Sequence, residues 1–198
     1  VCTSQQFILG PAVTSFEKAA ATMCAAPYAI GCASGTDALW LAMATAKIGS
    51  GAGSSSSDTV VTSPFSFFAT VSSILRVGAK PLLADIDPLT FNPSADAVEE
   101  VLATPDGTTV KAVLPVHLYG QCADWDAFTA LKQRQANLLL LEDAAQAFGA
   151  AWNGVPAGAL GDLAAFSFYP TKNLSAFGDA GMLTTLSDDF DERARMLR

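Results

Sequence analysis

A lysine within an otherwise uncharged stretch has the clearest potential for covalent chemistry in this sequence. Between Leu163 and Gly178, Lys172 is the only charged residue. Apolar and aromatic surroundings disfavour an ammonium group, so that the amine becomes a better nucleophile toward carbonyl carbon. Lys172 is therefore a candidate for Schiff-base formation. A lysine that extends from a loop into water explains the same residues, and lone loop lysines are more often of this second kind.

A carboxylate follows the most apolar run of the chain. Four leucines at residues 138–141 lead into Glu142 and Asp143, and alanines then surround Gln146. Small neighbours leave room for a ligand beside Asp143. Adjacent strand residues point to opposite faces, so we do not expect Glu142 and Asp143 to act as an acid and base pair.

Two other segments could contact a ligand. In residues 33–39 (ASGTDAL), Gly35 allows backbone amides to approach a ligand and Thr36 begins a helix, which is typical of a phosphate site at a helix N-terminus. An ordinary helix cap fits this segment equally well. Residues 63–70 (SPFSFFAT) add three phenylalanines, of which Phe67 is one, and core packing does not obviously explain all three.

The elements that must position these residues alternate between short β-rich runs and amphipathic stretches, which indicates parallel strands joined by crossover helices. The expected strands are residues 28–33, 59–63, 81–85, 111–116, 138–142, 164–168 and 182–186. The expected helices are residues 36–47, 68–77, 95–103 and 125–135. An irregular loop at residues 169–181 is too short for a helical crossover, so we expect the last strand to be antiparallel.

Ligands of such sheets bind outside the carboxyl ends of the strands, where the four segments described above begin. Together they supply a phosphate site, an aromatic ring, an acid and an amine. Pyridoxal phosphate requires this set of groups.

Three local features have simpler explanations. Residues 49–57 (GSGAGSSSS) fail the GxGxxG pattern at Ser54, and we interpret them as a flexible surface loop. Asn153-Gly154 predicts a two-residue hairpin turn. Asp85 and Asp87 precede Pro88, and we interpret them as turn residues rather than metal ligands.

Composition excludes several classes of protein. A net charge of -8 opposes binding to nucleic acid or to an anionic membrane. Four cysteines and one histidine lack metal-site or disulfide spacing, so we expect no metal and four buried thiols in a reduced cytoplasmic protein. The sequence has no apolar run of membrane-spanning length and no apolar signal-type segment behind a basic start, so we expect no membrane segment and no signal peptide.

The motifs, in this order, resemble the DegT/DnrJ/StrS family of pyridoxal-phosphate-dependent sugar aminotransferases, which have the aspartate aminotransferase fold (type I). The resemblance rests on residues 10–13 (GPAV), 16–17 (FE), 34–36 (SGT), 64–70, 78–81 (GAKP), 85–87 (DID), 116–121 (VHLYGQ), 142–146 (EDAAQ) and 166–168 (FSF) followed by Lys172. It implies an α/β fold, the large domain of a type I pyridoxal-phosphate-dependent transferase. That domain has three α/β/α layers and a mostly parallel seven-stranded sheet, with the last strand antiparallel.

The resemblance also implies roles for individual residues. Lys172 would form the internal aldimine and move a proton between cofactor and substrate carbons, and Asp143 would pair with the pyridinium nitrogen. The remaining cofactor contacts would be Gln146 to the ring hydroxyl, Phe67 stacked on the ring, and Gly35, Thr36 and Ser167 to the phosphate. The family's lysine loop usually ends in Gly-Glu-Gly-Gly, whereas residues 178–181 read Gly-Asp-Ala-Gly.

The implied activity is amino transfer, from glutamate, to the keto group of a nucleotide-linked sugar in polysaccharide or antibiotic sugar biosynthesis. We expect residues 1–198 to be the large domain, cut at both ends and without the C-terminal small domain of a full-length cytoplasmic homodimer. Alternatives are a related enzyme acting on an inosose, a dehydratase, or a non-catalytic cofactor-binding or regulatory protein. Dehydratases of this group carry histidine in place of the lysine, so Lys172 argues against that alternative.

Overall fold

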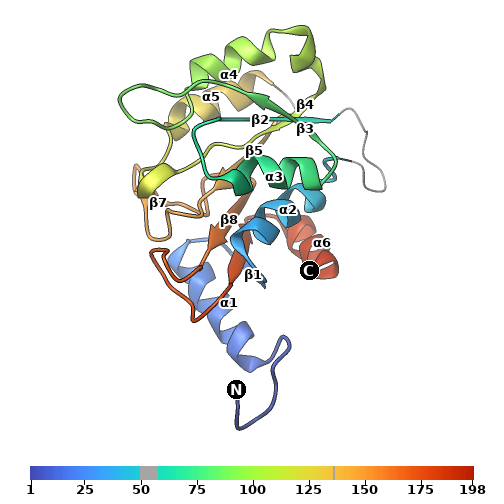
Figure 1. Cartoon of the computed structure of the whole chain (residues 1–198), viewed down its shortest axis with the longest axis vertical. Coiled ribbons are helices and arrows are strands. Elements are labelled where there is room, and N and C mark those ends of the chain that lie inside the picture. The colour runs from blue at the N-terminus through green and yellow to red at the C-terminus, as the bar shows by residue number, and fades with distance from the viewer. Residues whose placement is uncertain (50–57, 136) are drawn as a thin grey trace.

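A seven-stranded sheet forms the centre of the protein in the computed structural model, which describes residues 1–49, 58–135 and 137–198 (Figure 1). The strands are β1 (Tyr28–Cys32), β2 (Thr59–Thr62), β3 (Lys80–Leu83), β4 (Val110–Val113), β5 (Leu139–Asp143), β8 (Leu163–Ser167) and β9 (Gly181–Thr185). Their order across the sheet is β1-β9-β8-β5-β4-β2-β3. Strand β9 is antiparallel to both β1 and β8, and the other neighbours are parallel. The predicted antiparallel last strand is confirmed.

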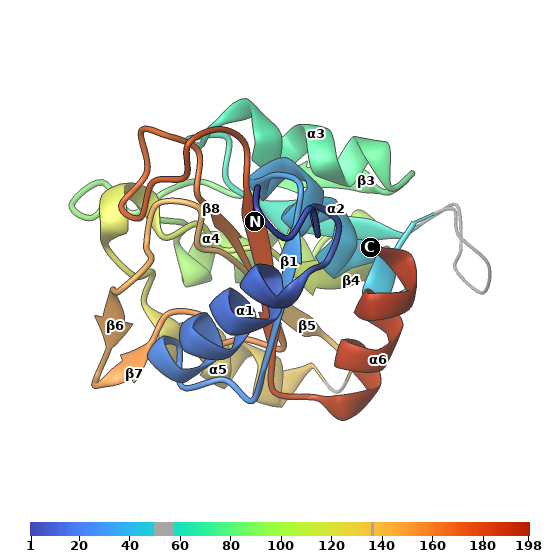
Figure 2. The ribbon, with the colours of Figure 1, turned by 90° about the horizontal axis from the view of Figure 1, so that it is seen from below.

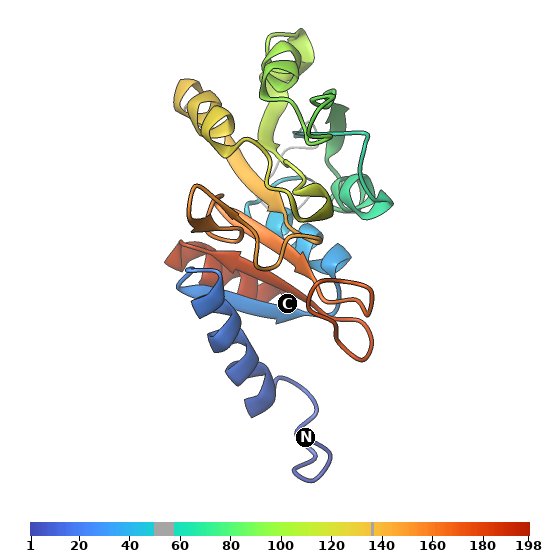
Figure 3. The ribbon, with the colours of Figure 1, turned by 90° about the vertical axis from the view of Figure 1, so that its left-hand side faces the viewer.

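Helices cover both faces of this sheet. They are α1 (Pro11–Met23), α2 (Gly35–Thr45), α3 (Phe68–Arg76), α4 (Ala95–Leu102), α5 (Trp125–Arg134) and α6 (Asp188–Leu197), with short 3₁₀ turns η1 (Pro105–Thr109) and η2 (Leu118–Gly120). One core contains residues of α2, α3 and α6, and two cores on the other face contain residues of α1, α4 and α5. Figures 2 and 3 show α1 and α5 on one side of the sheet and α2 and α3 on the other. The predicted three-layer α/β/α architecture is confirmed.

Burial on both faces explains the apolar character of the central strands. All residues of β2 (TVVT) are buried, as is usual for a parallel strand between two helical layers. In β5 and β8, alternate residues enter opposite cores: Leu141 and Ala165 lie on the α2 side, whereas Leu140 and Ala164 lie on the α1 and α5 side. The two faces of β5 therefore have separate environments, which decides where Glu142 and Asp143 point.

Capping residues set several helix starts. The side chains of Ser34, Ser94, Asp124 and Ser187 each accept a hydrogen bond from a backbone N–H in the first turn of α2, α4, α5 and α6, respectively. Helix α1 is absent from the sequence prediction, although Pro11 at its first position and its run of alanines favour a helix.

The hairpin predicted at Asn153-Gly154 is confirmed. Strands β6 (Ala151–Trp152) and β7 (Val155–Pro156) pair antiparallel, and both turn residues have positive φ, 48° at Asn153 and 85° at Gly154. The loop predicted at residues 49–57 lies, apart from Gly49, outside the described residues.

The cysteines differ from the expectation of four buried thiols. All four are unpaired; Cys24 and Cys122 are buried, but Cys2 is exposed and Cys32 is half-buried. Cys2 belongs to the N-terminal segment that extends away from the sheet (Figure 1), where no core can cover it. Burial raises the pKa of the Cys24 and Cys32 thiols to about 12.

Asp87 has the turn contacts expected from the sequence. Its Oδ1 accepts hydrogen bonds from the backbone N–H groups of Leu89 (2.9 Å) and Thr90 (2.8 Å). These bonds, the one from Thr90 first, lower the pKa of the Asp87 carboxyl. Among the described residues, no helix has the length and apolar character required to cross a lipid bilayer.

Candidate active site

A cavity of about 570 Å³ opens at the carboxyl edge of the sheet. Segments that follow β1, β2, β4, β5 and β8 line it, as the position rule for parallel sheets requires. The predicted site residues that line this cavity are Gly35, Thr36, Phe67, Asp143, Gln146, Ser167 and Lys172. The structure thus brings together every site residue named from the sequence, while their individual roles stay predictions.

Asp143 is a buried carboxylate at the base of this cavity, with 4% of its surface exposed. Its Oδ2 accepts a hydrogen bond from Thr70 Oγ1 (2.7 Å), and its Oδ1 accepts one from the Ala145 N–H (3.3 Å). Burial raises the pKa of this carboxyl above its ordinary value of 3.8, although the Thr70 hydrogen bond and the charge of Lys172 oppose the rise. A buried carboxylate beside a cavity needs a cationic partner, and a protonated ring nitrogen has the required charge.

The N-terminus of α2 forms another part of the wall. Ser34 caps the helix: its Oγ accepts a hydrogen bond from the Asp37 N–H (3.0 Å). Gly35 and Thr36 follow in the first turn and line the cavity. The positive end of the helix dipole and its backbone N–H groups favour an anion at this position, so the residues fit a phosphate group.

Gly35 allows α2 to lie directly against β8. A Cβ on Gly35 would lie 2.5 Å from Ser167 Cβ, closer than two non-bonded carbon atoms can approach. We expect Gly35→Ala to lower the free energy of unfolding by about 1–3 kcal/mol, since Ser167 and the start of α2 must separate. Denaturant unfolding measures this loss.

A second glycine provides the control for Gly35→Ala. A Cβ on Gly31 would meet its nearest neighbours, Glu17 Oε1 and Val13 Cγ1, at 3.5 Å, an ordinary van der Waals distance. Gly31→Ala should therefore change stability much less than Gly35→Ala. Equal losses in the two variants would show that the approach of α2 to Ser167 is not what requires glycine.

Lys172 lies in the loop after β8, where its backbone N–H donates to Tyr169 O (2.8 Å). The lysine is half-buried, and Tyr169, Leu174 and Phe177 are exposed. The apolar surroundings expected from the sequence are therefore not formed by this loop, because its large side chains face solvent. Lys172 instead shares the cavity wall with Asp179.

The residues before β9 accommodate the departure from the family's Gly-Glu-Gly-Gly pattern. Gly178 has φ of 154°, and Asp179 and Ala180 line the cavity. At Gly181 a Cβ would lie 2.1 Å from Ser34 O, so this position requires glycine. The two glycines that this chain retains are thus the ones at the turn and at the closest approach.

Exposed aromatic residues form part of the cavity wall. Phe67 is 68% exposed and Tyr169 is 51% exposed, and both line the cavity. Tyr119 is also exposed, has a positive φ of 55°, and donates its backbone N–H to Gln146 Oε1 (2.7 Å). This bond fixes the Gln146 amide beside the cavity, so that its NH₂ group carries the hydrogen-bond donors of the side chain.

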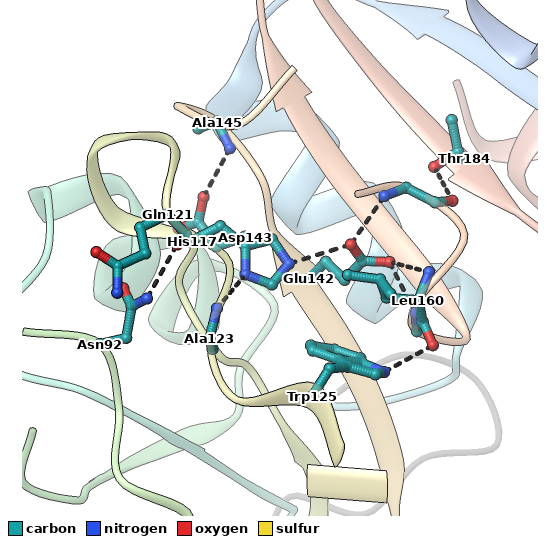
Figure 4. Close-up of polar contacts among 12 residues, drawn as sticks. Asn92, His117, Gln121, Ala123, Trp125, Glu142, Asp143, Ala145, Leu160 and Thr184 are labelled. Atoms are coloured by element: carbon teal, nitrogen blue, oxygen red, sulfur yellow. Dashed lines mark hydrogen bonds and ion pairs between the residues drawn. The ribbon is translucent and has the colours of Figure 1, made fainter. Parts of the chain in front are cut away.

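Glu142 points to the opposite face from Asp143, as expected for adjacent strand residues (Figure 4). Glu142 is 1% exposed, and its Oε2 lies 3.1 Å from Nε2 of the fully buried His117. Because His117 Nδ1 accepts the Ala123 N–H (3.1 Å), the proton of the neutral ring is on Nε2 and is donated to Glu142. The carboxylate also accepts backbone N–H groups from Gly158, Leu160 and Gly161.

This buried network fixes the loops on both sides of β5. The His117 backbone N–H donates to Asp143 O (3.0 Å), so the loop after β4 is held against the residue at the base of the cavity. We expect Glu142→Ala to lower the free energy of unfolding by about 3–5 kcal/mol, because several buried donors lose their acceptor.

Glu99→Ala is the control for Glu142→Ala, with urea unfolding as the measurement. Glu99 pairs with Arg134 at the surface, where both side chains are more than half exposed. Such an exposed pair contributes about 1 kcal/mol or less. Similar losses in the two variants would contradict the structural role assigned to Glu142.

Three residues that line the cavity, Ser66, Thr70 and Asp179, were not predicted as site residues, nor was Tyr119, which binds Gln146. All four belong to quoted motifs or to the altered loop end. Their side chains carry no charge pattern that distinguishes a ligand contact from a turn residue. Position relative to a strand end was the available signal, and it applies to Ser66 and Thr70, which follow β2.

Known proteins resemble this chain over its whole length. The model of the DegT/DnrJ/EryC1/StrS aminotransferase family matches residues 1–198. A pleiotropic regulatory protein of Geobacillus stearothermophilus is 46% identical over 198 residues, which is 100% of this chain and 50% of the relative. The UDP-2-acetamido-2-deoxy-3-oxo-D-glucuronate aminotransferase of Pseudomonas aeruginosa is 40% identical over 97% of this chain and 50% of its own length. The chain thus spans about half the length of these relatives.

Solved structures agree with the fold. Streptomyces venezuelae DesV, in complex with a ketimine intermediate, has a TM-score of 0.91 and 39% identity, covering 100% of this chain and 50% of DesV. NtdA from Bacillus subtilis, with bound cofactor PMP, has a TM-score of 0.86 and 32% identity, covering 98% of this chain and 41% of NtdA. The predicted fold is confirmed, and the PMP bound to NtdA belongs to the same class of cofactor as the predicted pyridoxal phosphate. The chain belongs to the DegT/DnrJ/EryC1/StrS aminotransferase family.

Proposed function

We propose that the protein containing this chain transfers an amino group from glutamate to the keto group of a nucleotide-linked sugar, using pyridoxal phosphate. The observation that carries the proposal is the convergence of Lys172, the buried Asp143 carboxylate and the α2 N-terminus on one cavity. An amine, a counter-ion for a ring nitrogen and a phosphate site are the groups that this cofactor needs.

Each part of the cofactor would have a partner in the cavity wall. Lys172 Nζ would attach it covalently, the first turn of α2 with Ser167 would hold its phosphate, and Asp143 would bind its ring nitrogen. The Gln146 amide would donate to the ring hydroxyl, and the Phe67 ring would stack on the cofactor. When bound, pyridoxal phosphate supplies an electron sink that stabilises negative charge on a substrate carbon.

The chain's own residues would then orient the reactants and move protons. Lys172 Nζ would be the basic group that carries a proton from one carbon to the next during transfer. The Asp143 carboxylate would keep the ring nitrogen protonated, which the low polarity of its buried site makes effective. Glutamate would leave as 2-oxoglutarate after giving its amino group, and the keto sugar would receive that group.

The substrate class comes from the relatives. Besides the Pseudomonas aminotransferase, the names of two relatives describe a GDP-perosamine synthase and a dTDP-3-amino-3,4,6-trideoxy-alpha-D-glucose transaminase. These names support a nucleotide-linked keto sugar as acceptor. As the resemblance implies, we propose that the protein is cytoplasmic and that the full-length protein is a homodimer.

A regulatory function is the second candidate, because the Geobacillus relative is named as a pleiotropic regulatory protein. The test loads the full-length protein with pyridoxal phosphate, adds glutamate, and measures 2-oxoglutarate and the absorbance of the lysine-linked cofactor. We expect one 2-oxoglutarate per cofactor and loss of that absorbance, followed by recovery when a keto-sugar nucleotide is added. Cofactor binding without 2-oxoglutarate would favour the regulatory function.

A further inference from the structure

Two hydroxyl groups lie in line with the Asp143 carboxylate. Thr70 is fully buried on α3, and its Oγ1 lies 2.7 Å from Asp143 Oδ2 and 2.7 Å from Ser66 Oγ. We propose that Thr70 is a positioning residue that orients the Asp143 carboxylate toward the cofactor's ring nitrogen, with Ser66 as the second member of the hydrogen-bond chain. This inference rests on the proposed function for the identity of the ligand.

The direction of the chain follows from the chemistry of its members. An ionised carboxylate only accepts hydrogen bonds, so Thr70 must donate its single hydroxyl proton to Asp143 Oδ2. Thr70 Oγ1 then has lone pairs but no proton for the 2.7 Å contact with Ser66, which must donate. Both protons therefore point toward Asp143, and the chain can reverse only when that carboxyl is protonated.

This arrangement distinguishes the two carboxylate oxygens. Oδ2 accepts the short Thr70 bond, whereas Oδ1 accepts a longer bond from the Ala145 N–H at 3.3 Å. Each carboxylate oxygen has two acceptor sites, and the weaker bond leaves Oδ1 with more capacity for a further donor. Thr70 thus directs Oδ1 to the ring N–H.

Thr70 also favours the ionised form of Asp143. The charged groups that share the cavity with this carboxylate are Lys172, from the loop after β8, and Asp179, from the segment before β9. His117, from the loop after β4, contacts Asp143 through its backbone N–H. Glu142 is adjacent in sequence, but it lies on the other face and binds His117. Burial raises the pKa of Asp143, and the Thr70 hydrogen bond is the largest influence that lowers it. Loss of this bond should raise that pKa further.

The experiment titrates Asp143 in the cofactor-free full-length protein by NMR of ¹³C-labelled aspartate carboxyl groups, with Asp143→Asn to assign the signal. Thr70→Val removes the hydroxyl and keeps the shape of the side chain. We expect it to raise the midpoint of the Asp143 titration and to weaken pyridoxal phosphate binding about tenfold. Thr70→Ser keeps the hydroxyl and should restore both values toward those of the wild type.

Three results would overturn the proposal. The first is an unchanged midpoint in folded Thr70→Val, and the second is an equal rise in Thr70→Ser. If Thr70→Val does not fold, Ser66→Ala replaces it, because Ser66 is the half-buried outer member of the hydrogen-bond chain. We expect Ser66→Ala to raise the midpoint of the Asp143 titration, and the third contradicting result is no rise in this variant.

The titration separates this inference from the proposed function. A raised midpoint in Thr70→Val combined with a wild type that does not bind pyridoxal phosphate would support the hydroxyl chain and reject the cofactor. Normal cofactor binding in all variants with an unchanged midpoint would reject the role of Thr70 and leave the proposed function standing.

Discussion

Lys172→Ala is expected to abolish covalent attachment of pyridoxal phosphate while the protein stays folded. Among the described residues that line the cavity, Lys172 alone carries a side-chain amine. Its position in a mostly exposed loop implies a change in unfolding free energy within about 0.5 kcal/mol. Borohydride reduction followed by peptide mass analysis should find a pyridoxyl group on Lys172 in the wild type and none in the variant.

The matched control for this prediction is Lys47→Ala. Lys47 is exposed after the end of α2 and does not line the cavity, so its replacement should leave the adduct unchanged. Lys132, on α5, is a further internal reference, because its Nζ forms an ion pair with Asp162 Oδ1 at 2.6 Å. A reduced adduct on Lys47 or Lys132 would show that Lys172 is not the attachment site.

Much of the fold could be predicted because its signals are local. The buried run of β2, the alternation of strands and helices, and the Asn153-Gly154 turn each depend on residues close in sequence. The cavity's location follows from a single rule about strand ends, which is why residues from separate segments could be grouped before their contacts were known. Glu142 and Asp143 were assigned to opposite faces from the two-residue period of a strand alone.

Contacts between distant segments could not be predicted. Thr70 and Asp143 are 73 residues apart, and neither side chain indicates the other. The need for glycine at position 35 depends on Ser167, which approaches only when α2 packs on β8. The prediction of apolar surroundings for Lys172 was wrong for a related reason: its sequence neighbours Leu174 and Phe177 are exposed and do not line the cavity.

Asp143→Asn is expected to retain covalent attachment of the cofactor and to lose most transamination. A neutral amide cannot hold the pyridinium proton by charge, and losing such a preorganised group lowers turnover by about 10²–10³-fold.

The same change should make the cofactor-free protein more stable at neutral pH. Burial raises the pKa of Asp143 above 3.8, so the folded state loses this proton less readily than the unfolded state does. The contribution of Asp143 to the free energy of unfolding therefore falls as pH rises above about 4.

These opposite effects make the Asp143 prediction specific. Denaturant unfolding of the cofactor-free wild type and Asp143→Asn should give similar free energies at low pH, with a growing advantage for the variant as pH rises to neutrality. Turnover with glutamate should be lower in the variant than in the wild type.

Glu142→Gln is the adjacent control. The Glu142 side chain lies on the opposite face, bound to His117 and away from the cavity, so this change should lower the free energy of unfolding and have a smaller effect on turnover. Unchanged turnover in Asp143→Asn would show that this carboxylate does not face the ring nitrogen, and lower stability at neutral pH would show that its buried charge is already compensated within the chain.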